Sequence, residues 1–346
     1  MATEQNERDA WLGRVVEQPL EPERAIIDPH HHLWDHPGSR YMLDEILRDT
    51  ATGHRVLATV FVECMSMYRA DGPEPMRPVG ETEFVNGIAA QSASGQYGDT
   101  RVAAGIVGFA DLTLGAAVEP VLEAHIAAAP ARFRGIRHAA GFDADPRIRN
   151  SHTNPPAELY KSARFREGFA NLSKLGLSFE AWQYHPQMPE VIDLARAFPN
   201  TTIILNHFGG PLGIGPYEGH GEEIFVRWKT DMAELARCPN VVVKLGGINM
   251  PVNGFGWNKR PSPPTSDELV AATRGYYLHA IDKFGAQRCM FESNFPVDRV
   301  SCSYGVLWNS FKKISAGFTE DEKSWLFHRT AAQVYRVSLP PRPART

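Results

Sequence analysis

The chain has 346 residues, a formal net charge of −4 at pH 7 and four cysteines. Because no block is rich in lysine or arginine, the composition argues against nucleic acid as a partner. No stretch reaches the roughly 18 to 20 uninterrupted apolar residues of a membrane span, and the polar start MATEQNERDAWLGR lacks the apolar core of a secretory signal. We therefore expect a cytoplasmic protein with reduced cysteines and no contact with membranes.

Short β-rich runs alternate with segments of helical periodicity along the chain. The β-rich runs are residues 25–28, 56–64, 102–110, 133–138, 177–184, 201–208, 240–248 and 289–295. The amphipathic segments are residues 81–93, 116–129, 157–176, 187–198, 221–238, 266–285 and 303–317. Alternation of this kind predicts parallel βαβ units, and eight of them predict a closed (β/α)8 barrel, the TIM-barrel form of the α/β class.

Local signals set some helix ends and leave others open. Ser266 is a plausible N-cap ahead of the residues DELV, and Gly176 and Gly285 follow the ends of two predicted helices. The segment after the first strand, residues 39–54, mixes helix and loop signals and is the least clear element.

The chain divides into three parts by pattern. We expect an N-terminal extension at residues 1–24, one barrel domain at residues 25–338 and a disordered tail at residues 339–346. Two long loops rich in Gly and Pro, residues 65–81 and 249–266, follow the second and seventh strands. Long loops in a compact domain are often functional, and these follow the carboxyl ends of strands, where barrel enzymes place their sites.

Three consecutive histidines end the first predicted strand, in AIIDPHHHLWDH. Side chains of a strand alternate between its two faces, so Asp28, His30 and His32 share one side while His31 lies on the other. This spacing could direct two imidazoles to one point.

Polar residues also follow the other predicted strands, and a barrel gathers them around one mouth. They are Glu63 on the second, Arg137 and His138 on the fourth, Trp182, Tyr184 and His185 on the fifth, Asn206 and His207 on the sixth, Lys244 and Asn249 on the seventh, and Glu292, Asn294 and Asp298 on the eighth.

Two kinds of chemistry fit this set. Imidazoles from separate strands can hold a divalent ion with an open position for water. Without a metal, a His or a carboxylate can take the proton of water while Arg or another His polarises a carbonyl. Either arrangement suits attack on an ester, a lactone or an amide, and the sequence has no GxSxG, HExxH or GxxxxGK[ST] motif for competing chemistry.

Four motifs together carry a family resemblance: DPHHHLWD, RGIRH, LNHFGGP and MFESNFPVD. With these, residues 25–336 resemble the amidohydrolase superfamily, in the TIM-barrel branch that includes 2-pyrone-4,6-dicarboxylate lactonase, sulfomuconolactone hydrolase and sugar lactonases. The resemblance implies that His30 and His32 form the HxH pair and that His207 is the histidine of a later strand. These three would be the metal ligands if an ion is bound.

The resemblance also implies that Arg137 and His138 contact the substrate. Where the family carries an aspartate on its eighth strand, this chain has Asn294, whose amide cannot accept a proton at neutral pH. Glu292, Asp298 and Glu63 are the candidate substitutes. One divalent ion, zinc or manganese, and catalysis without a metal both remain open, because the branch is thought to contain both kinds of enzyme.

The sequence thus predicts a hydrolase that opens a lactone or a related cyclic ester with activated water. His30, His32 and His207 would activate water or polarise the carbonyl, with Arg137 on a carboxylate or carbonyl of a small-molecule substrate. Substrate contacts are further expected from Glu63, His138, Trp182, Tyr184, His185 and Trp257. The main alternative is a carboxy-lyase that acts on an aromatic or muconate-type acid. The second alternative is a barrel that binds a ligand without catalysis. A homodimer is compatible with each of these functions.

Overall fold

The computed structural model describes residues 2–338, with side chains from residue 5 onward. Its main sheet has eight parallel strands in the order β1-β4-β5-β6-β7-β8-β9-β10. The strands are β1 (Ile26–His31), β4 (Val56–Val62), β5 (Arg101–Gly108), β6 (Phe133–Arg137), β7 (Ser178–Ala181), β8 (Ile203–Leu205), β9 (Val241–Leu245) and β10 (Cys289–Phe291). The predicted (β/α)8 TIM barrel is confirmed.

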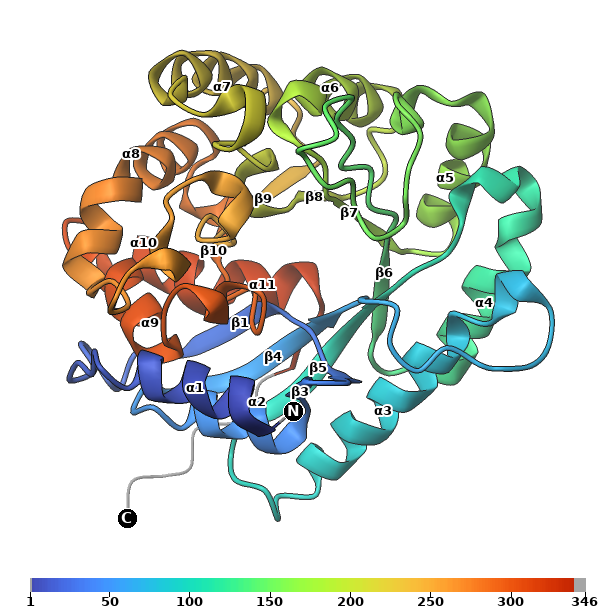
Figure 1. Ribbon diagram of the computed structural model, residues 1–346. Helices are drawn as coiled ribbons and strands as arrows, with labels where there is room; N and C mark the ends of the chain where they lie inside the picture. The colour runs from blue at the N-terminus through green and yellow to red at the C-terminus, as the bar shows by residue number, and fades with distance from the viewer. Residues whose placement is uncertain (1, 339–346) are drawn as a thin grey trace.

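Helices surround the strands (Figure 1). They are α1 (Ala2–Leu12), α2 (Leu43–Thr50), α3 (Val79–Ala93), α4 (Glu119–Ala128), α5 (Ala163–Lys174), α6 (Met188–Ala197), α7 (Gly221–Leu235), α8 (Ser266–Phe284), α9 (Tyr304–Ile314), α10 (Glu320–Ser324) and α11 (Thr330–Val334), with a π-helical turn at Trp325–Arg329. None of the helices in residues 2–338 is long and apolar enough to cross a membrane.

The barrel closes through the segment after β10. The backbone N–H of Asn294 donates to the carbonyl of His30 at 3.0 Å, and the N–H of His32 donates to the carbonyl of Phe295 at 2.8 Å. Asp28 reinforces this seam, because its carboxylate accepts from the N–H of Ser293 at 2.9 Å and from the hydroxyl of Tyr304 at 3.0 Å. The histidines of β1 are therefore fixed against the eighth strand.

Apolar and polar residues form successive layers inside the barrel. Ile204, Val242 and Met290 belong to a buried apolar cluster that also includes Tyr335 from the C-terminal segment. Residues two positions later on a strand point to the same side, and there the sequence places the polar residues Asn206, Lys244 and Glu292. The apolar layer is thus the floor beneath a polar layer at the carboxyl ends of the strands.

Three local features differ from the sequence-based expectations. The N-cap of α8 is Thr265 and not Ser266, because the Thr265 hydroxyl accepts from the N–H of Glu268. The helix predicted over 157–176 begins only at Ala163, after the N-cap Ser162. The mixed segment 39–54 divides into a strand and a helix: β2 (Trp34–His36) pairs with β3 (Ser39–Tyr41) in a hairpin before α2.

The N-terminal residues pack on the barrel. Arg8 donates to the carbonyl of Val300 at 2.9 Å and Trp11 to the carbonyl of Arg260 at 3.0 Å. The predicted tail at residues 339–346 lies outside the described residues.

Candidate active site

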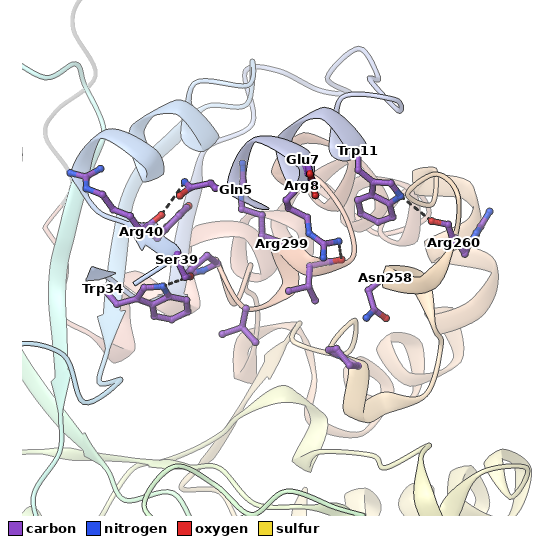
Figure 2. A pocket seen from close by; sticks show the side chains of 16 residues that line it. Gln5, Glu7, Arg8, Trp11, Trp34, Ser39, Arg40, Asn258, Arg260 and Arg299 are labelled. Atoms are coloured by element: carbon purple, nitrogen blue, oxygen red, sulfur yellow. Dashed lines mark hydrogen bonds between the residues drawn. The ribbon is translucent and has the colours of Figure 1, made fainter. Parts of the chain in front are cut away.

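Two cavities are candidates for the site, one beside the N-terminal helix α1 and one at the carboxyl ends of the strands. The larger, about 810 Å³, lies between α1, the β2–β3 hairpin and the loop after β10 (Figure 2). Its arginines already have partners in the protein: Arg40 pairs with Glu45, Arg260 with Glu268, Arg299 with Asp9, and Arg8 donates to the Val300 carbonyl. None of the histidines at the strand ends lines it, so it offers no catalytic group.

The smaller cavity, about 440 Å³, opens at the carboxyl ends of the strands. It is lined by His32, Trp34, His36, Ser39, Cys64, Arg137, Arg149, His152, Trp182, His207, Met250, Asn294 and Val297. This is the face on which barrel enzymes place their active sites, and residues from at least five strands or the loops after them meet there. We assign the candidate active site to this cavity.

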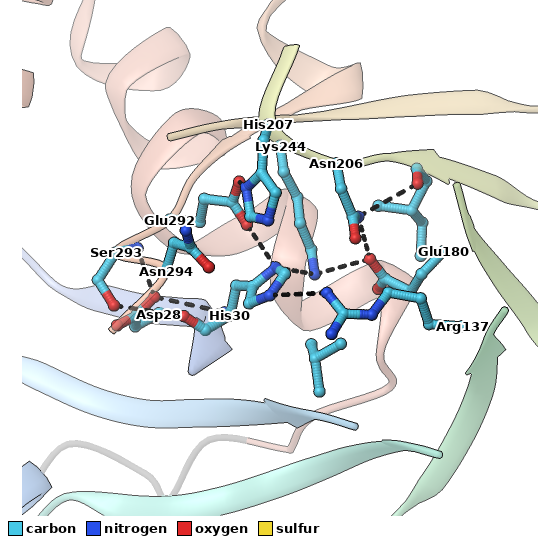
Figure 3. A network of polar contacts seen from close by, with 12 residues as sticks. Asp28, His30, Arg137, Glu180, Asn206, His207, Lys244, Glu292, Ser293 and Asn294 are labelled. Atoms are coloured by element: carbon cyan, nitrogen blue, oxygen red, sulfur yellow. Dashed lines mark hydrogen bonds and ion pairs between the residues drawn. The ribbon is translucent and has the colours of Figure 1, made fainter. Parts of the chain in front are cut away.

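Glu292 contacts two histidines in the polar layer at the carboxyl ends of the strands (Figure 3). One carboxylate oxygen, Oε1, lies 2.7 Å from Nδ1 of His207, and the other, Oε2, lies 2.8 Å from Nδ1 of His30. The rings of His30 and His207 are 4.6 Å apart between centroids. All three side chains are almost completely buried. Their proximity was predicted only as a shared barrel mouth, and the structure brings them into direct contact.

Burial sets the protonation of this group. It holds the pKa values of His30 and His207 well below their usual range, and neighbouring cations act in the same direction. It also raises the pKa of Glu292 to about 8, although Lys244 partly opposes this rise. The imidazoles are therefore neutral near pH 7, so each has a ring nitrogen that can accept a proton or bind a cation.

The three consecutive histidines at the end of β1 and just after it point in different directions. His31 contacts the hydroxyl of Thr59 with Nε2 at 2.9 Å and packs against Phe61, away from the cavity. His32 lines the cavity and donates Nδ1–H to the carbonyl of Val62 at 2.7 Å. The remaining nitrogen of His32, Nε2, is therefore its acceptor atom.

Arg137 is held by Glu63. Its Nε donates to Oε1 of Glu63 at 2.6 Å, its Nη2 donates to the Glu63 carbonyl at 2.6 Å, and its Nη1 lies 3.4 Å from Nε2 of His30. The second carboxylate oxygen of Glu63 lies 2.9 Å from Nε2 of His152. Burial alone would raise the pKa of Glu63, but His152 and Arg137 outweigh it and hold the pKa far below its usual range. Glu63 therefore stays ionised and cannot act as a base near neutral pH.

A second buried ion pair lies beneath His30. Nζ of Lys244 is 2.8 Å from the carboxylate of Glu180 and 3.3 Å from Nδ1 of His30. Glu180 also accepts from the amide of Asn206 and the hydroxyl of Tyr335. Cationic donors thus approach both ring nitrogens of His30, which keeps this ring unprotonated.

Asn294 and Asp298 form a separate pair. The amide of Asn294 lines the cavity and donates to Oδ1 of Asp298 at 3.1 Å, while the N–H of Asn249 donates to the other oxygen at 3.3 Å. Asp298 is fully buried behind Asn294, and burial raises its pKa to about 8. Of the candidate carboxylates, only Glu292 contacts His30 and His207.

The donor set at the floor fits a divalent ion. One donor atom from each of His30, His207 and Glu292 lies within 4.8 Å of the others. Although Oε2 of Glu292 is close to His30, the approach is not aligned for a hydrogen bond, and this buried oxygen has no other partner in residues 2–338. Nitrogen and carboxylate ligands of this kind suit zinc. His32, predicted as a ligand, is not part of this cluster.

Besides Glu63, which lies behind Arg137, four predicted substrate contacts lie outside the cavity lining. His138 packs between Phe109 and Phe165 and accepts from the N–H of Leu112, and His185 accepts from the N–H of Leu212. Tyr184 supports Trp182, with ring centroids 5.8 Å apart. Trp257 stacks on Phe255 and lies against Arg260.

Several cavity residues were not among the predicted site residues. Arg149 and His152 come from the irregular segment between β6 and α5, which has no periodicity to direct a side chain. Trp34, His36 and Ser39 come from the hairpin after β1. Lys244 was noted in the sequence as a polar residue on a predicted strand. Its partner Glu180 was not noted, although Glu180 is a charged residue within an apolar run.

Comparison with known proteins places the chain in a family. The family model described as Amidohydrolase matches residues 27–337. The chain is 35% identical over 327 residues to "Uncharacterized protein y4mH" of Sinorhizobium fredii, covering 90% of this chain and 99% of that protein. It is 24% identical over 326 residues to the L-fucono-1,5-lactonase of Burkholderia multivorans, covering 91% and 97%.

A solved structure shares the fold. The crystal structure of an amidohydrolase from Burkholderia multivorans with bound zinc superposes with a TM-score of 0.69 at 24% identity, covering 92% of this chain and 100% of that chain. The family match over nearly the whole barrel confirms the resemblance seen in the motifs, and the chain belongs to the amidohydrolase family.

Proposed function

We propose that the protein hydrolyses a lactone or a related cyclic ester by activated-water attack in the 440 Å³ cavity. The observation that carries this proposal is the position of Glu292, which lies 2.7 Å from His207, a residue of the cavity lining, and 2.8 Å from His30. The similarity to an L-fucono-1,5-lactonase supports the substrate class.

His207 is the residue best placed to take the proton of water. Glu292 accepts Nδ1–H of His207, which leaves Nε2 of that ring as the nitrogen with a lone pair, and the ring lines the cavity. In its ionised form, which becomes more populated as the pH rises toward its pKa of about 8, Glu292 fixes the tautomer of His207 and stabilises the imidazolium as it forms. The proton taken from water is then available for the alkoxide that leaves when the ring opens.

Arg137 and Asn294 complete the polar wall. Arg137 brings a fixed positive charge to the cavity beside His30, where a carbonyl oxygen gains charge during attack. The Nδ2 of Asn294 is used by Asp298, so its oxygen is the atom that can accept a hydrogen bond from water or from a substrate hydroxyl.

A divalent ion would be held by His30, His207 and Glu292. When bound, such an ion supplies a Lewis acid and lowers the pKa of a water molecule. Ion and protons use the same donor atoms, so we expect metal binding to release protons and to strengthen as the pH rises.

Identifying the reaction product tests this proposal. Incubation with a panel of sugar and dicarboxylic lactones should release one titratable acid per turnover, followed with a pH indicator. Release of carbon dioxide from an aromatic or muconate-type acid, without acid from any lactone, would replace this proposal with a carboxy-lyase. Repeating the assay after treatment with a chelator separates catalysis that needs an ion from catalysis that does not.

A further inference from the structure

The lining of the catalytic cavity has an unusual charge balance. It includes two arginines and four histidines, and within the described part of the chain it includes no aspartate or glutamate. The whole protein, by contrast, has a net charge of −4. Glu292 and Glu63 lie behind this lining, in contact with His207 and with Arg137, and the side chains that face the cavity favour an anionic ligand over a cationic one.

The two arginines of the lining differ in how much of their charge is available. Two of the guanidinium nitrogens of Arg137 are bound by Glu63, at 2.6 Å each. Arg149 has no ion pair and no side-chain hydrogen bond to any residue in the range 5–338, where side chains are described. Arg149 therefore has more of its donors free for a second group of the ligand than Arg137 has.

The backbone of Arg149 is fixed relative to the catalytic histidines. The hydroxyl of Tyr184 donates to the Arg149 carbonyl. Tyr184 packs edge-on against Trp182, and Trp182 packs edge-on against His207 with ring centroids 4.8 Å apart. A chain of packed side chains thus connects the backbone of Arg149 to His207, so the point from which the Arg149 side chain extends is fixed relative to this histidine.

Another part of the cavity lining suits a ring. His32, Trp34 and His36 form a stack in which neighbouring ring centroids are 5.9 Å apart, with interplanar angles of 21° and 20°. All three line the cavity.

We propose that Arg149 determines specificity by binding a carboxylate on the lactone, so that the preferred substrate is an anionic, carboxylate-bearing lactone and not a neutral sugar lactone. This rests on the proposed function for the reaction itself. It does not rest on Arg137, two of whose guanidinium nitrogens are bound by Glu63. The planar fork of an arginine matches a carboxylate with two parallel hydrogen bonds.

The chain offers a matched control two residues away. Arg147 lies on the same loop, is 62% exposed, and is paired with Asp145 at 2.7 Å outside the cavity lining. The test compares wild type, Arg149→Met and Arg147→Met on two lactones. D-glucaro-1,4-lactone carries a carboxylate where D-glucono-1,4-lactone carries a CH2OH group, so the pair isolates the effect of the anion.

We expect the wild type to prefer the glucarolactone by tenfold or more in kcat/KM. Arg149→Met should raise KM for the glucarolactone about tenfold to a hundredfold, leave kcat for it nearly unchanged, and leave the gluconolactone unaffected. Arg147→Met should behave as the wild type. Equal use of both lactones by the wild type, or unchanged preference in Arg149→Met, would overturn the role of Arg149 while hydrolysis stands.

A binding measurement without turnover tests the anion site independently of the hydrolysis reaction. Isophthalate, a flat ring with two carboxylates, is titrated calorimetrically into the same three proteins at low and high salt. Binding that weakens at least tenfold in Arg149→Met and with rising salt, but not in Arg147→Met, supports the anion site even if no lactone is opened. If isophthalate binds equally well to Arg149→Met, or does not bind to the wild type, the inference is wrong.

Discussion

Glu292 and His207 meet at the floor of the barrel, with Oε1 of the carboxylate 2.7 Å from Nδ1 of the imidazole. They are 85 residues apart in the chain. The resemblance leads one to expect an aspartate where this chain has Asn294, whereas the carboxylate that contacts the histidines is that of Glu292, two residues earlier in the chain.

Metal binding should depend on His30 and not on its neighbour. Zinc added to metal-free wild type should raise Tm, because an ion that binds only the folded state stabilises it. His30→Asn removes a donor atom of the cluster and should abolish the shift. His31→Asn changes the adjacent residue, which points to Thr59, and should keep it. A zinc-dependent Tm rise in His30→Asn equal to that of the wild type would rule out this ligand set.

Removing Arg137 should destabilise the fold as well as the site. Arg137→Met leaves the buried charge of Glu63 without its guanidinium, and we expect a loss of about 3 to 5 kcal/mol in the free energy of unfolding in urea. Arg69→Met breaks an ion pair whose side chains are 41% and 47% exposed, and should cost less than about 1 kcal/mol. If the two variants lose similar stability, the buried ion pair between Arg137 and Glu63 does not stabilise the fold more than an exposed pair does.

Gly247 should be needed for the position of His207. It has φ +66°, and a Cβ added there would lie 2.0 Å from Nδ1 of His207. Gly256 has φ +67° with nothing within 4 Å of an added Cβ. Both alanine variants carry the same backbone strain, but only Gly247→Ala should lower kcat, by about a hundredfold or more. Equal kcat values for the two variants would show that the His207 position tolerates displacement.

Stability should fall in mild acid partly because of His125, far from the catalytic cavity. Burial lowers the pKa of this imidazole to about 4, from 6.5. Between these values the unfolded chain binds more protons than the folded one, so folding stability is lost as the pH falls below 6.5. The contribution is about 2 kcal/mol between pH 7 and pH 5.

Urea unfolding at pH 7 and pH 5 checks this. His125→Gln should lose about 2 kcal/mol less than the wild type over that interval. His220→Gln, whose side chain is 57% exposed, should lose as much as the wild type. An unchanged pH slope in His125→Gln would mean that this residue titrates equally in both states.

The barrel could be predicted from the sequence because each strand is an apolar run and the segments between the strands have helical periodicity. The sequence also predicted that His30, His207 and Glu292 share one mouth, since all three stand at strand ends. The period of two further explains why His138 turns away: Arg137 points into the barrel, so its neighbour points out.

What the sequence could not predict lies where regular structure ends. After β7, the chain turns into a short 3-10 helix at His185–Gln187, so alternation no longer places Tyr184 and His185. Arg149 and His152 reach the cavity from an irregular segment, where only tertiary packing sets their direction. The pairing of Asn294 with Asp298 likewise depends on the turn after β10.

The most direct test of the account is the rate of acid release by Glu292→Gln, an isostere that keeps the size of the side chain but cannot ionise. Measured on the lactone that the wild type opens fastest, with urea unfolding to show that the variant is folded, kcat should fall at least about a thousandfold. A variant that retained more than a tenth of the wild-type rate would contradict the assignment of the His30, His207 and Glu292 group as the catalytic centre.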